Sequence, residues 1–214
     1  MAARRRLRLS SRLFWIVAIG AVVAGYADTA AAATTEKLKQ VEGALTRARH
    51  DHDNVRSLKA NLAQEVTAVR AALRIAAAES CTGGLIAALL TEIPGSSSVI
   101  GRSFVTYSNR AKREVLGVDE GLLKQHGAVS EPVARAMAQN TFDMTTAHLT
   151  VAVSGIAGPG GGSDEKPVGT VHMATATKDD VIHQCCQFGD IGRAAVRLAT
   201  VHAAADMLLA RLKD

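Results

Sequence analysis

The stretch "AESCTGG" at residues 78–84 decides the fold, because it directly follows the largely apolar residues 73–77. An apolar run that ends in small, turn-forming residues is typical of a buried strand that leads into a helix. The stretch contains a candidate nucleophile, Ser80, and a second one beside it, Cys81. Its two glycines allow the backbone to come close to a ligand. Alternatively, Ser80 is only the N-cap of a helix over residues 82–92.

Strand-like and helix-like segments alternate along the rest of the chain, which predicts an α/β domain with helices on both faces of a sheet. The short polar turn "TKDD" separates the last two strands, so part of the sheet is expected to be antiparallel. Asn109 and Ser130 are the expected N-caps of two helices. The predicted strands cover residues 73–78, 98–108, 149–155, 169–177 and 181–188, and the predicted helices cover residues 82–92, 110–117, 119–125, 131–147 and 191–212.

The first part of the chain is organised differently. Residues 1–33 combine a basic stretch with an apolar run at residues 13–25, which indicates a signal peptide or a short membrane anchor. An arginine-rich transit peptide and an extension upstream of the true start are the alternatives. Apolar spacings of three and four then predict a long helix, of which residues 34–60 form a coiled-coil-like spacer. The α/β domain is expected over residues 61–214, and residues 7–33 are the candidate for membrane contact.

The composition argues against a nucleic-acid-binding protein. The formal net charge is +5, but five arginines and one acid within residues 1–33 account for most of it. Only 3% of the residues are aromatic, so few side chains could stack on bases. The three cysteines include one adjacent pair and show neither a disulfide framework nor the spacing of zinc ligands. We therefore expect neither a nucleic-acid partner nor a bound metal.

A serine nucleophile needs a base, and no histidine is an obvious partner in the sequence. Lys112 in "YSNRAK" is the alternative, because the dipole of a helix lowers the pKa of a lysine in its first turn. The dipole supplies only about 0.3–1 kcal/mol, so burial would have to provide most of the shift. A surface lysine is the competing interpretation. Tyr107, the first residue of this segment, is either a core residue or directs its hydroxyl into the site.

A glycine-rich loop over residues 154–169 is the third element. A strand that ends in such a loop can bind an anion through its backbone N–H groups. The loop has neither the lysine of a Walker loop nor the spacing of a Rossmann fingerprint. A flexible connection without a ligand is the alternative.

Eight short motifs occur along the chain in the order "AESCTGG", "PGSS", "YSNRAK", "LGV", "GAVS", "GIAGPGGG", "KPVGTV" and "FGDIGRAAVR". Through them the chain resembles the CinA C-terminal domain family, the nicotinamide mononucleotide (NMN) amidohydrolases. The resemblance covers roughly residues 60–212. It implies a three-layer α/β/α sandwich with a mixed sheet that forms homo-oligomers, either dimers or larger assemblies.

The resemblance also implies a reaction, the hydrolysis of the NMN carboxamide to nicotinate mononucleotide and ammonia in pyridine nucleotide (NAD) salvage, without cofactor or metal. Ser80 matches the nucleophile and Lys112 matches the general base, and Tyr107, which lies on the motif beside that lysine, is the third expected catalytic residue. Arg102 and Arg193 are candidates for the NMN phosphate, because a guanidinium binds phosphate well. The other residues expected at the substrate are Thr82, Gly83, Gly84, Ser108, Asn109, Gly155, Ala157, Gly158 and Gly161.

Two other functions are compatible with the same motifs. One is a membrane-tethered nucleotide-binding module of the same fold with little or no turnover, and the other is an amidase for a different carboxamide. By resemblance the domain is expected in the cytoplasm, whereas the N-terminal segment leaves membrane anchoring or export open.

Overall fold

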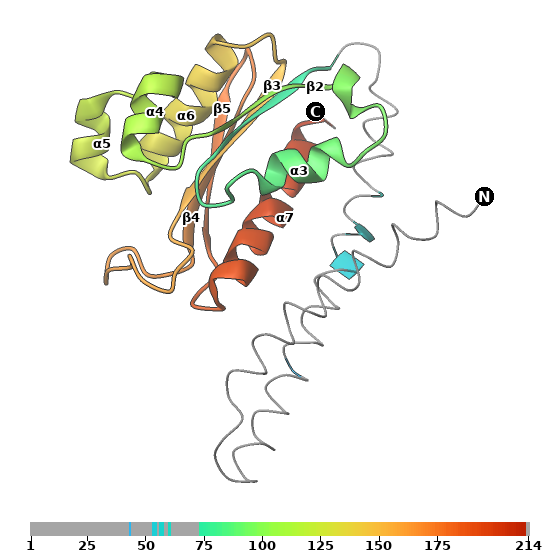
Figure 1. The fold of residues 1–214 in the computed structure, drawn as a ribbon. Helices are drawn as coiled ribbons and strands as arrows, with labels where there is room; N and C mark the ends of the chain where they lie inside the picture. Colours follow the sequence, from blue (N-terminus) through green and yellow to red (C-terminus); the bar gives the residue numbers. More distant parts are fainter. Residues whose placement is uncertain (1–42, 44–52, 55, 58–59, 61–72, 213–214) are drawn as a thin grey trace. The chain divides into compact units, whose positions relative to one another are not determined.

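The computed structural model describes residues 43, 53–54, 56–57, 60 and 73–212, which are drawn in colour in Figure 1. The chain divides into two compact units, residues 1–50 and 51–214, and the α/β domain belongs to the second. The predicted targeting segment and nearly all of the predicted spacer lie outside the described residues.

The described strands form one mixed sheet in the order β2-β1-β3-β4-β5. β1 (Ile75–Glu79) pairs in parallel with β2 (Ile100–Val105) on one side and with β3 (Leu149–Gly155) on the other. β4 (Thr170–Ala176) is antiparallel to β3, and β5 (Val181–Gln187) is antiparallel to β4. The prediction of a partly antiparallel sheet is therefore confirmed.

Helices cover both faces of the sheet (Figure 1). α3 (Leu85–Thr91) and α7 (Arg193–Arg211) pack on one face, and α6 (Glu131–Asp143) packs on the other. α4 (Asn109–Leu116) and α5 (Glu120–His126) lie beside α6, while the short 3-10 helix η1 (Ser96–Ser98) precedes β2. The described part of the chain is thus a three-layer α/β/α domain, as predicted.

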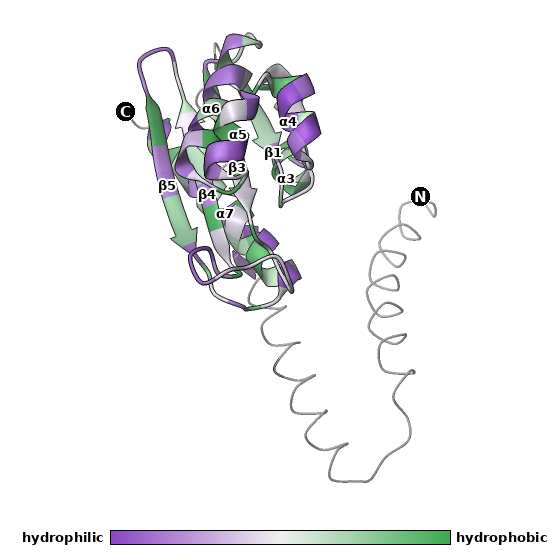
Figure 2. Ribbon diagram, turned by 90° about the vertical axis from the view of Figure 1, so that its left-hand side faces the viewer, coloured by the Kyte–Doolittle hydropathy of each residue, from purple (hydrophilic) through white to green (hydrophobic). Residues whose placement is uncertain are grey.

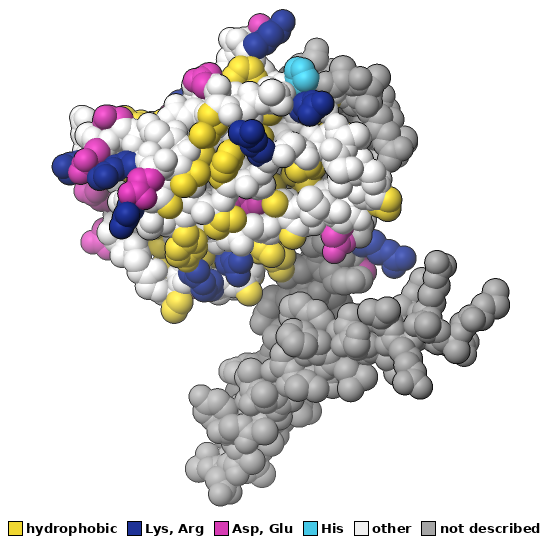
Figure 3. All heavy atoms as spheres, turned by 45° about the horizontal axis from the view of Figure 1, so that its top comes forward, with side chains coloured by type: hydrophobic (Ala, Val, Ile, Leu, Met, Phe, Trp, Pro, Cys, Tyr) yellow, Lys and Arg dark blue, Asp and Glu magenta, His cyan; other side chains and the backbone are white. Residues whose placement is uncertain are grey.

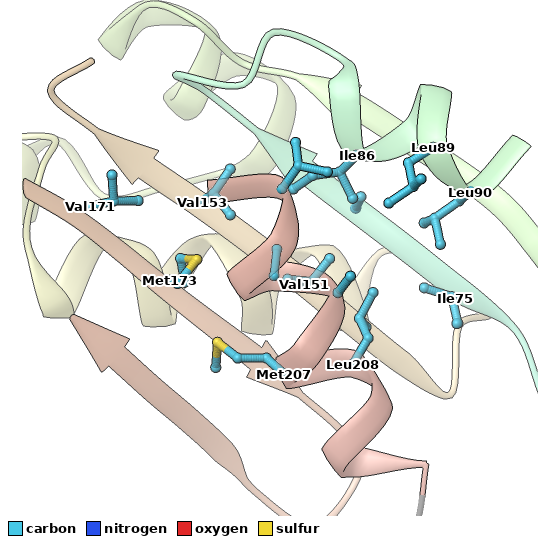
Figure 4. Packing of buried hydrophobic residues seen from close by; sticks show 14 of the residues in the cluster. Ile75, Ile86, Leu89, Leu90, Val151, Val153, Val171, Met173, Met207 and Leu208 are labelled. Atoms are coloured by element: carbon cyan, nitrogen blue, oxygen red, sulfur yellow. The ribbon is translucent and has the colours of Figure 1, made fainter. Parts of the chain in front are cut away.

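Each helical layer buries its own apolar core, because successive side chains of a strand point to opposite faces of the sheet. Val151 and Val153 pack in the core beneath α3 and α7, where Figure 4 shows Val151 near Leu208. Ala152, between them in the sequence, packs in the second core with Met137 of α6. Both faces of the central strands are therefore covered, which explains why β1 and β3 are apolar without alternation.

Two predicted helix caps differ from the structure. The N-cap of α4 is Ser108, whose Oγ accepts a hydrogen bond from the Ala111 N–H at 3.0 Å, so Asn109 is the first helical residue and not the cap. Ser130 occupies the N-cap position of α6, but its hydroxyl donates to the Gly127 carbonyl at 2.9 Å and caps nothing.

The outer surface formed by α4 and α5 is polar and mixed in charge. Figure 2 shows hydrophilic residues on the exposed parts of α4 and α5 and hydrophobic residues along the strands. At the end formed by these two helices, acidic and basic side chains are interspersed (Figure 3), and the ion pairs there include Arg113–Glu120 and Lys124–Glu120. Exposed pairs contribute about 0–1 kcal/mol each, so this surface adds little to stability. Among the described residues, no helix is both long and apolar enough to cross a membrane.

Candidate active site

The candidate site lies where the sheet changes its direction of winding. The chain leaves β1 through α3 to reach β2 on one side, and later returns through α4, α5 and α6 to place β3 on the other side. Ligands of open α/β sheets bind at the carboxyl ends of such strands, in the crevice at the switch point. Ser80 directly follows β1 at this position.

Glu79 organises the turn that contains Ser80. Its side chain is completely buried and accepts four hydrogen bonds, from the Thr82 hydroxyl and from the N–H groups of Gly84, Ile86 and Ala87, at 2.7 to 3.0 Å. All four donors point at its two oxygens, as expected for a carboxylate that satisfies the free N–H groups of a helix start. Glu79 therefore caps α3 from the preceding strand.

The interpretation of Ser80 as a helix cap is consequently wrong. α3 begins at Leu85, its N-cap is Gly84, and no side chain in the cap position makes a capping bond. The helix starts later than predicted because Gly83 and Gly84 have φ values of +61° and +98°, which a right-handed helix cannot include. The hydroxyl of Ser80 is therefore available for another task.

That hydroxyl lies against a buried lysine. Lys112 Nζ is 2.9 Å from Ser80 Oγ and donates to the Thr106 carbonyl at 2.8 Å. The lysine comes from the first turns of α4 and its side chain is only 1% exposed. The interpretation of Lys112 as a surface residue is therefore wrong, and Ser80 and Lys112 have the geometry of a nucleophile and its base.

Burial lowers the pKa of Lys112 toward the range in which a lysine can act as a base near neutral pH. Loss of solvation lowers the pKa of its ammonium from 10.5 to about 8, and the electrostatic interaction with Cys81 opposes this change. Desolvation disfavours the charged form of a lysine, so burial is the expected cause. A sizeable fraction of Lys112 is then neutral near physiological pH.

Cys81 has the opposite character. Its thiol is 4% exposed, and burial raises its pKa from 9.0 to about 11. Because the thiolate is the reactive form, Cys81 is inert at neutral pH although it is adjacent to Ser80. Within the described part of the chain, no group of three His, Cys, Asp or Glu side chains is arranged to hold a metal ion.

Two backbone N–H groups near Ser80 have no oxygen acceptor among the described residues. The Gly83 N–H is bonded to the Ser80 carbonyl at 3.1 Å, and the next N–H groups along the chain are used by Glu79 and by the turn itself. Burial raises the pKa of the Cys81 thiol, and the N–H groups of Cys81 and Thr82 oppose this rise, so both groups lie close to its sulfur. Among the described residues neither N–H donates to a carbonyl or carboxylate oxygen. These two groups are the candidate oxyanion donors.

Two arginines of α7 complete the site. Arg193, at the start of the helix, donates to the Tyr107 hydroxyl at 2.6 Å and to the Gly158 carbonyl at 3.0 Å. Arg197 lies one turn later on the same helix face and donates to the carbonyls of Cys81 and Thr82 at 3.1 and 2.8 Å. Arg193 thereby links the glycine-rich loop to the segment before Lys112, and Arg197 links α7 to the serine turn.

The end of β3 lies tightly against this turn. A Cβ added at Gly155 would be 2.6 Å from Val171 Cγ2 and 3.1 Å from Cys81 Sγ, so only glycine fits there. Gly158 and Gly161 follow in the loop, both with φ above +80°. The structure therefore joins Ser80 to Lys112, joins Arg193 to Tyr107 and Gly158, and places Gly155 against Cys81 of the serine turn.

Other predicted site residues are placed differently. The Thr82 hydroxyl is buried on Glu79, the Ser108 hydroxyl caps α4, and Ala157 is a core residue at 4% exposure. Asn109 is exposed at the start of α4.

Arg102 is not brought to the site. It pairs with Ala76 near the beginning of β1, and its guanidinium donates to the Met144 carbonyl at the end of α6. Because β1 and β2 are parallel, this position is toward the amino ends of the strands, whereas Ser80 lies beyond their carboxyl ends.

Sequence reasoning missed Glu79 and Arg197. The signal for Glu79 was a carboxylate at the end of an otherwise apolar strand. A carboxylate buried at such a position must have its oxygens satisfied by hydrogen bonds. The signal for Arg197 was its spacing of four residues from Arg193, which places both side chains on one face of the helix.

Comparison with known proteins agrees with this architecture. The model of the CinA C-terminal domain family matches residues 56–212, so it begins five residues before the predicted domain start. A "CinA-like protein" of Akkermansia muciniphila is 60% identical over 104 residues, which are 49% of this chain and 25% of that protein. A "CinA-like protein" of Mycobacterium avium is 48% identical over 150 residues, which are 70% of this chain and 33% of that protein. The chain thus spans a third or less of the length of these curated relatives.

Solved structures show the same fold. The crystal structure of the competence/damage inducible protein CihA from Agrobacterium tumefaciens has a TM-score of 0.71 and 49% identity, covering 75% of this chain and 96% of that one. A CinA superfamily protein from Escherichia coli has a TM-score of 0.67 and 34% identity, covering 72% of this chain and 88% of that one. Since the family model also matches most of its length, the chain belongs to the CinA C-terminal domain family.

Proposed function

We propose that this domain hydrolyses the carboxamide of NMN to nicotinate mononucleotide and ammonia through a Ser80–Lys112 dyad. The observation that carries the proposal is the buried contact of 2.9 Å between Lys112 Nζ and Ser80 Oγ, combined with a lysine pKa lowered to about 8. A structural lysine would gain nothing from such burial, since burial of an ammonium beside a hydroxyl destabilises the fold.

The reaction begins with proton transfer. Neutral Lys112 takes the proton of Ser80 while Oγ attacks the carboxamide carbon. The N–H groups of Cys81 and Thr82 bind the oxyanion that forms. The Lys112 ammonium then gives its proton to the departing nitrogen, and ammonia leaves an acyl ester on Ser80. A water molecule transfers a proton to Lys112 and attacks the ester, which releases the carboxylate product and returns the proton to Oγ.

The basic end of α7 suits an anionic substrate. Arg193 is exposed at the start of this helix and reaches both Tyr107 and the glycine-rich loop. A guanidinium with two hydrogen-bond acceptors already in place is held rigidly for a further phosphate contact. In this proposal Arg193 binds the NMN phosphate, and Tyr107 fixes the orientation of the guanidinium.

Measurement of ammonia released from NMN tests the proposal. Ser80→Ala should remain folded and lose activity by orders of magnitude. Substitution of the adjacent buried thiol, Cys81→Ala, is the matched control and should retain most activity. Ammonia release by the Ser80→Ala enzyme at the wild-type rate would contradict the proposal.

Two outcomes of the same assay favour the alternatives. Binding of NMN without any ammonia release would indicate a nucleotide-binding module, and release from a different carboxamide alone would indicate another amidase. A homo-oligomer and a cytoplasmic location, which the family resemblance implies, belong to the proposal as well.

A further inference from the structure

The peptide unit between Cys81 and Thr82 is the middle of a tight turn. The Gly83 N–H donates to the Ser80 carbonyl at 3.1 Å, so the turn runs from Ser80 to Gly83. The N–H of this middle peptide is the Thr82 donor, and its C=O is the Cys81 carbonyl. Rotation of the middle peptide is the change that converts one common turn type into the other. Such a rotation would replace the Thr82 donor by a carbonyl oxygen at the site.

Arg197 holds the carbonyl side of this turn. Its Nε donates to the Cys81 carbonyl at 3.1 Å and its Nη2 donates to the Thr82 carbonyl at 2.8 Å. The side chain is half-buried, and within the described residues no carboxylate forms an ion pair with it. Its charge therefore acts on the two carbonyls, and hydrogen bonds from an ionised donor are about twice as strong as neutral ones.

We infer that Arg197 is a positioning residue, which keeps the Cys81–Thr82 peptide oriented so that the Thr82 N–H is directed at the oxyanion. This inference rests on the proposed serine mechanism. Arg197 acts in two ways: it fixes the carbonyl away from the site, and it polarises the same peptide unit so that the N–H becomes a stronger donor.

Two neighbouring residues limit the size of the effect. Thr82 is β-branched and disfavours the positive φ that the rotated turn would require, so it also opposes the rotation. Glu79 holds the following N–H groups from inside the protein. Loss of a whole oxyanion donor lowers kcat about 10²- to 10³-fold, so loss of Arg197 should cost less, about 10- to 100-fold.

The decisive variant is Arg197→Met, assayed with NMN. We expect a kcat about 10- to 100-fold lower, a KM within about threefold of the wild type, and an unchanged pKa in the pH dependence of kcat/KM, because the Ser80–Lys112 contact is retained. Arg197→Lys keeps the charge and can reach one carbonyl, so it should restore part of kcat. If Arg197→Met does not fold, Arg197→Lys decides alone: a reduced kcat supports the inference, and a wild-type kcat overturns it.

A second measurement reports the oxyanion site without turnover. Pyridine-3-boronic acid forms a tetrahedral adduct with a reactive serine, and one of its oxygens occupies the oxyanion position. In Arg197→Met its affinity should fall by about the same factor as kcat/KM. An unchanged affinity would overturn the inference, because a purely structural arginine would not affect this adduct.

Arg135→Met is the matched control. Arg135 is also half-buried and also donates from a helix to a backbone carbonyl, that of Val181, but it lies on α6 and outside the site. Its loss should leave kcat unchanged. A folded Arg197→Met enzyme with the kcat of Arg135→Met would refute the positioning role. Activity retained by Ser80→Ala would instead refute the proposed function itself, so the two failures are distinguishable.

Discussion

The pH dependence of the enzyme tests the central feature of the site, the neutral Lys112. Its pKa is lowered from 10.5 to about 8 by burial. A lysine with a pKa near 8 is about one-tenth neutral at pH 7, whereas an unperturbed lysine would be neutral in roughly one molecule in 3,000. The structure therefore supplies a roughly 300-fold larger population of active base at neutral pH.

The rate should follow this population. We expect kcat/KM for ammonia release from NMN to rise about tenfold per pH unit below pH 8 and to level off above it. Lys112→Arg should reduce kcat by orders of magnitude at saturating NMN, because arginine cannot give up its proton. The exposed lysine of α5 provides a control, since Lys124→Arg should change nothing. A rate that is independent of pH between 6 and 9, or a near-normal kcat for Lys112→Arg, would refute the dyad.

Stability should change with pH in a higher window than the rate does. Between pH 8 and 10.5 the unfolded chain binds more protons at Lys112 than the folded protein does, so Lys112 makes the free energy of unfolding rise with pH. Cys81, whose pKa is raised by burial, opposes this rise above pH 9 in the wild type and in Lys112→Met alike. The difference between a pKa of 10.5 and one of about 8 corresponds to roughly 3 kcal/mol. Below pH 8 this cost is fully present. Lys112→Met should lack the rise, as measured by urea denaturation at pH 8 and pH 10.5, and an equal rise in both proteins would contradict the assigned pKa.

Three further predictions concern the surroundings of the dyad. The pKa of about 11 at Cys81 predicts that thiol reagents at pH 8 modify the exposed Cys185 and leave Cys81 unmodified, which peptide mass spectrometry would detect. Gly155→Ala should destabilise the domain by about 1–3 kcal/mol in thermal unfolding, because its Cβ would lie 2.6 Å from Val171 Cγ2. Glu79→Gln should cost roughly 2–4 kcal/mol in urea denaturation, since an amide group would direct its own donors at N–H groups of α3.

Much of the fold could be predicted from local pattern. The strands were found because β1 and β3 are apolar runs that end in turn residues, and the antiparallel pair followed from the polar turn between β4 and β5. The start of α3 could not be found in this way. The prediction placed it at residue 82, whereas two glycines with positive φ delay the helix until Leu85. Glycine permits a left-handed backbone but does not require it, so sequence alone could not place this boundary.

The candidate dyad was predictable as a pair of residues, but its chemistry was not. The pKa of Lys112 depends on how completely the fold covers one side chain, and the same lysine on the surface of α4 would be charged. Arg102, a candidate for the NMN phosphate, was misplaced at the site for a similar reason. It is close to Tyr107 in the sequence, yet an extended strand rises about 3.3 Å per residue and separates the two ends of β2. The role of Arg197 depends on bonds across more than a hundred positions, for which the sequence carries no local signal.

The identity of the residue that caps α3 decides how the serine turn should be understood. A helix start needs acceptors for its free N–H groups, and a serine at this position normally provides one. Here Glu79 accepts those N–H groups from the end of β1, so the capping role is filled before the chain reaches Ser80. Burial of a carboxylate is costly, and it is offset only because all four donors converge on it. The consequence is a rigid turn in which Ser80 has no structural task and its oxygen faces Lys112. Removal of this oxygen in Ser80→Ala should therefore leave the start of α3 intact while abolishing turnover. Any loss of stability should come from the acceptor that the buried Lys112 loses, and not from a lost helix cap.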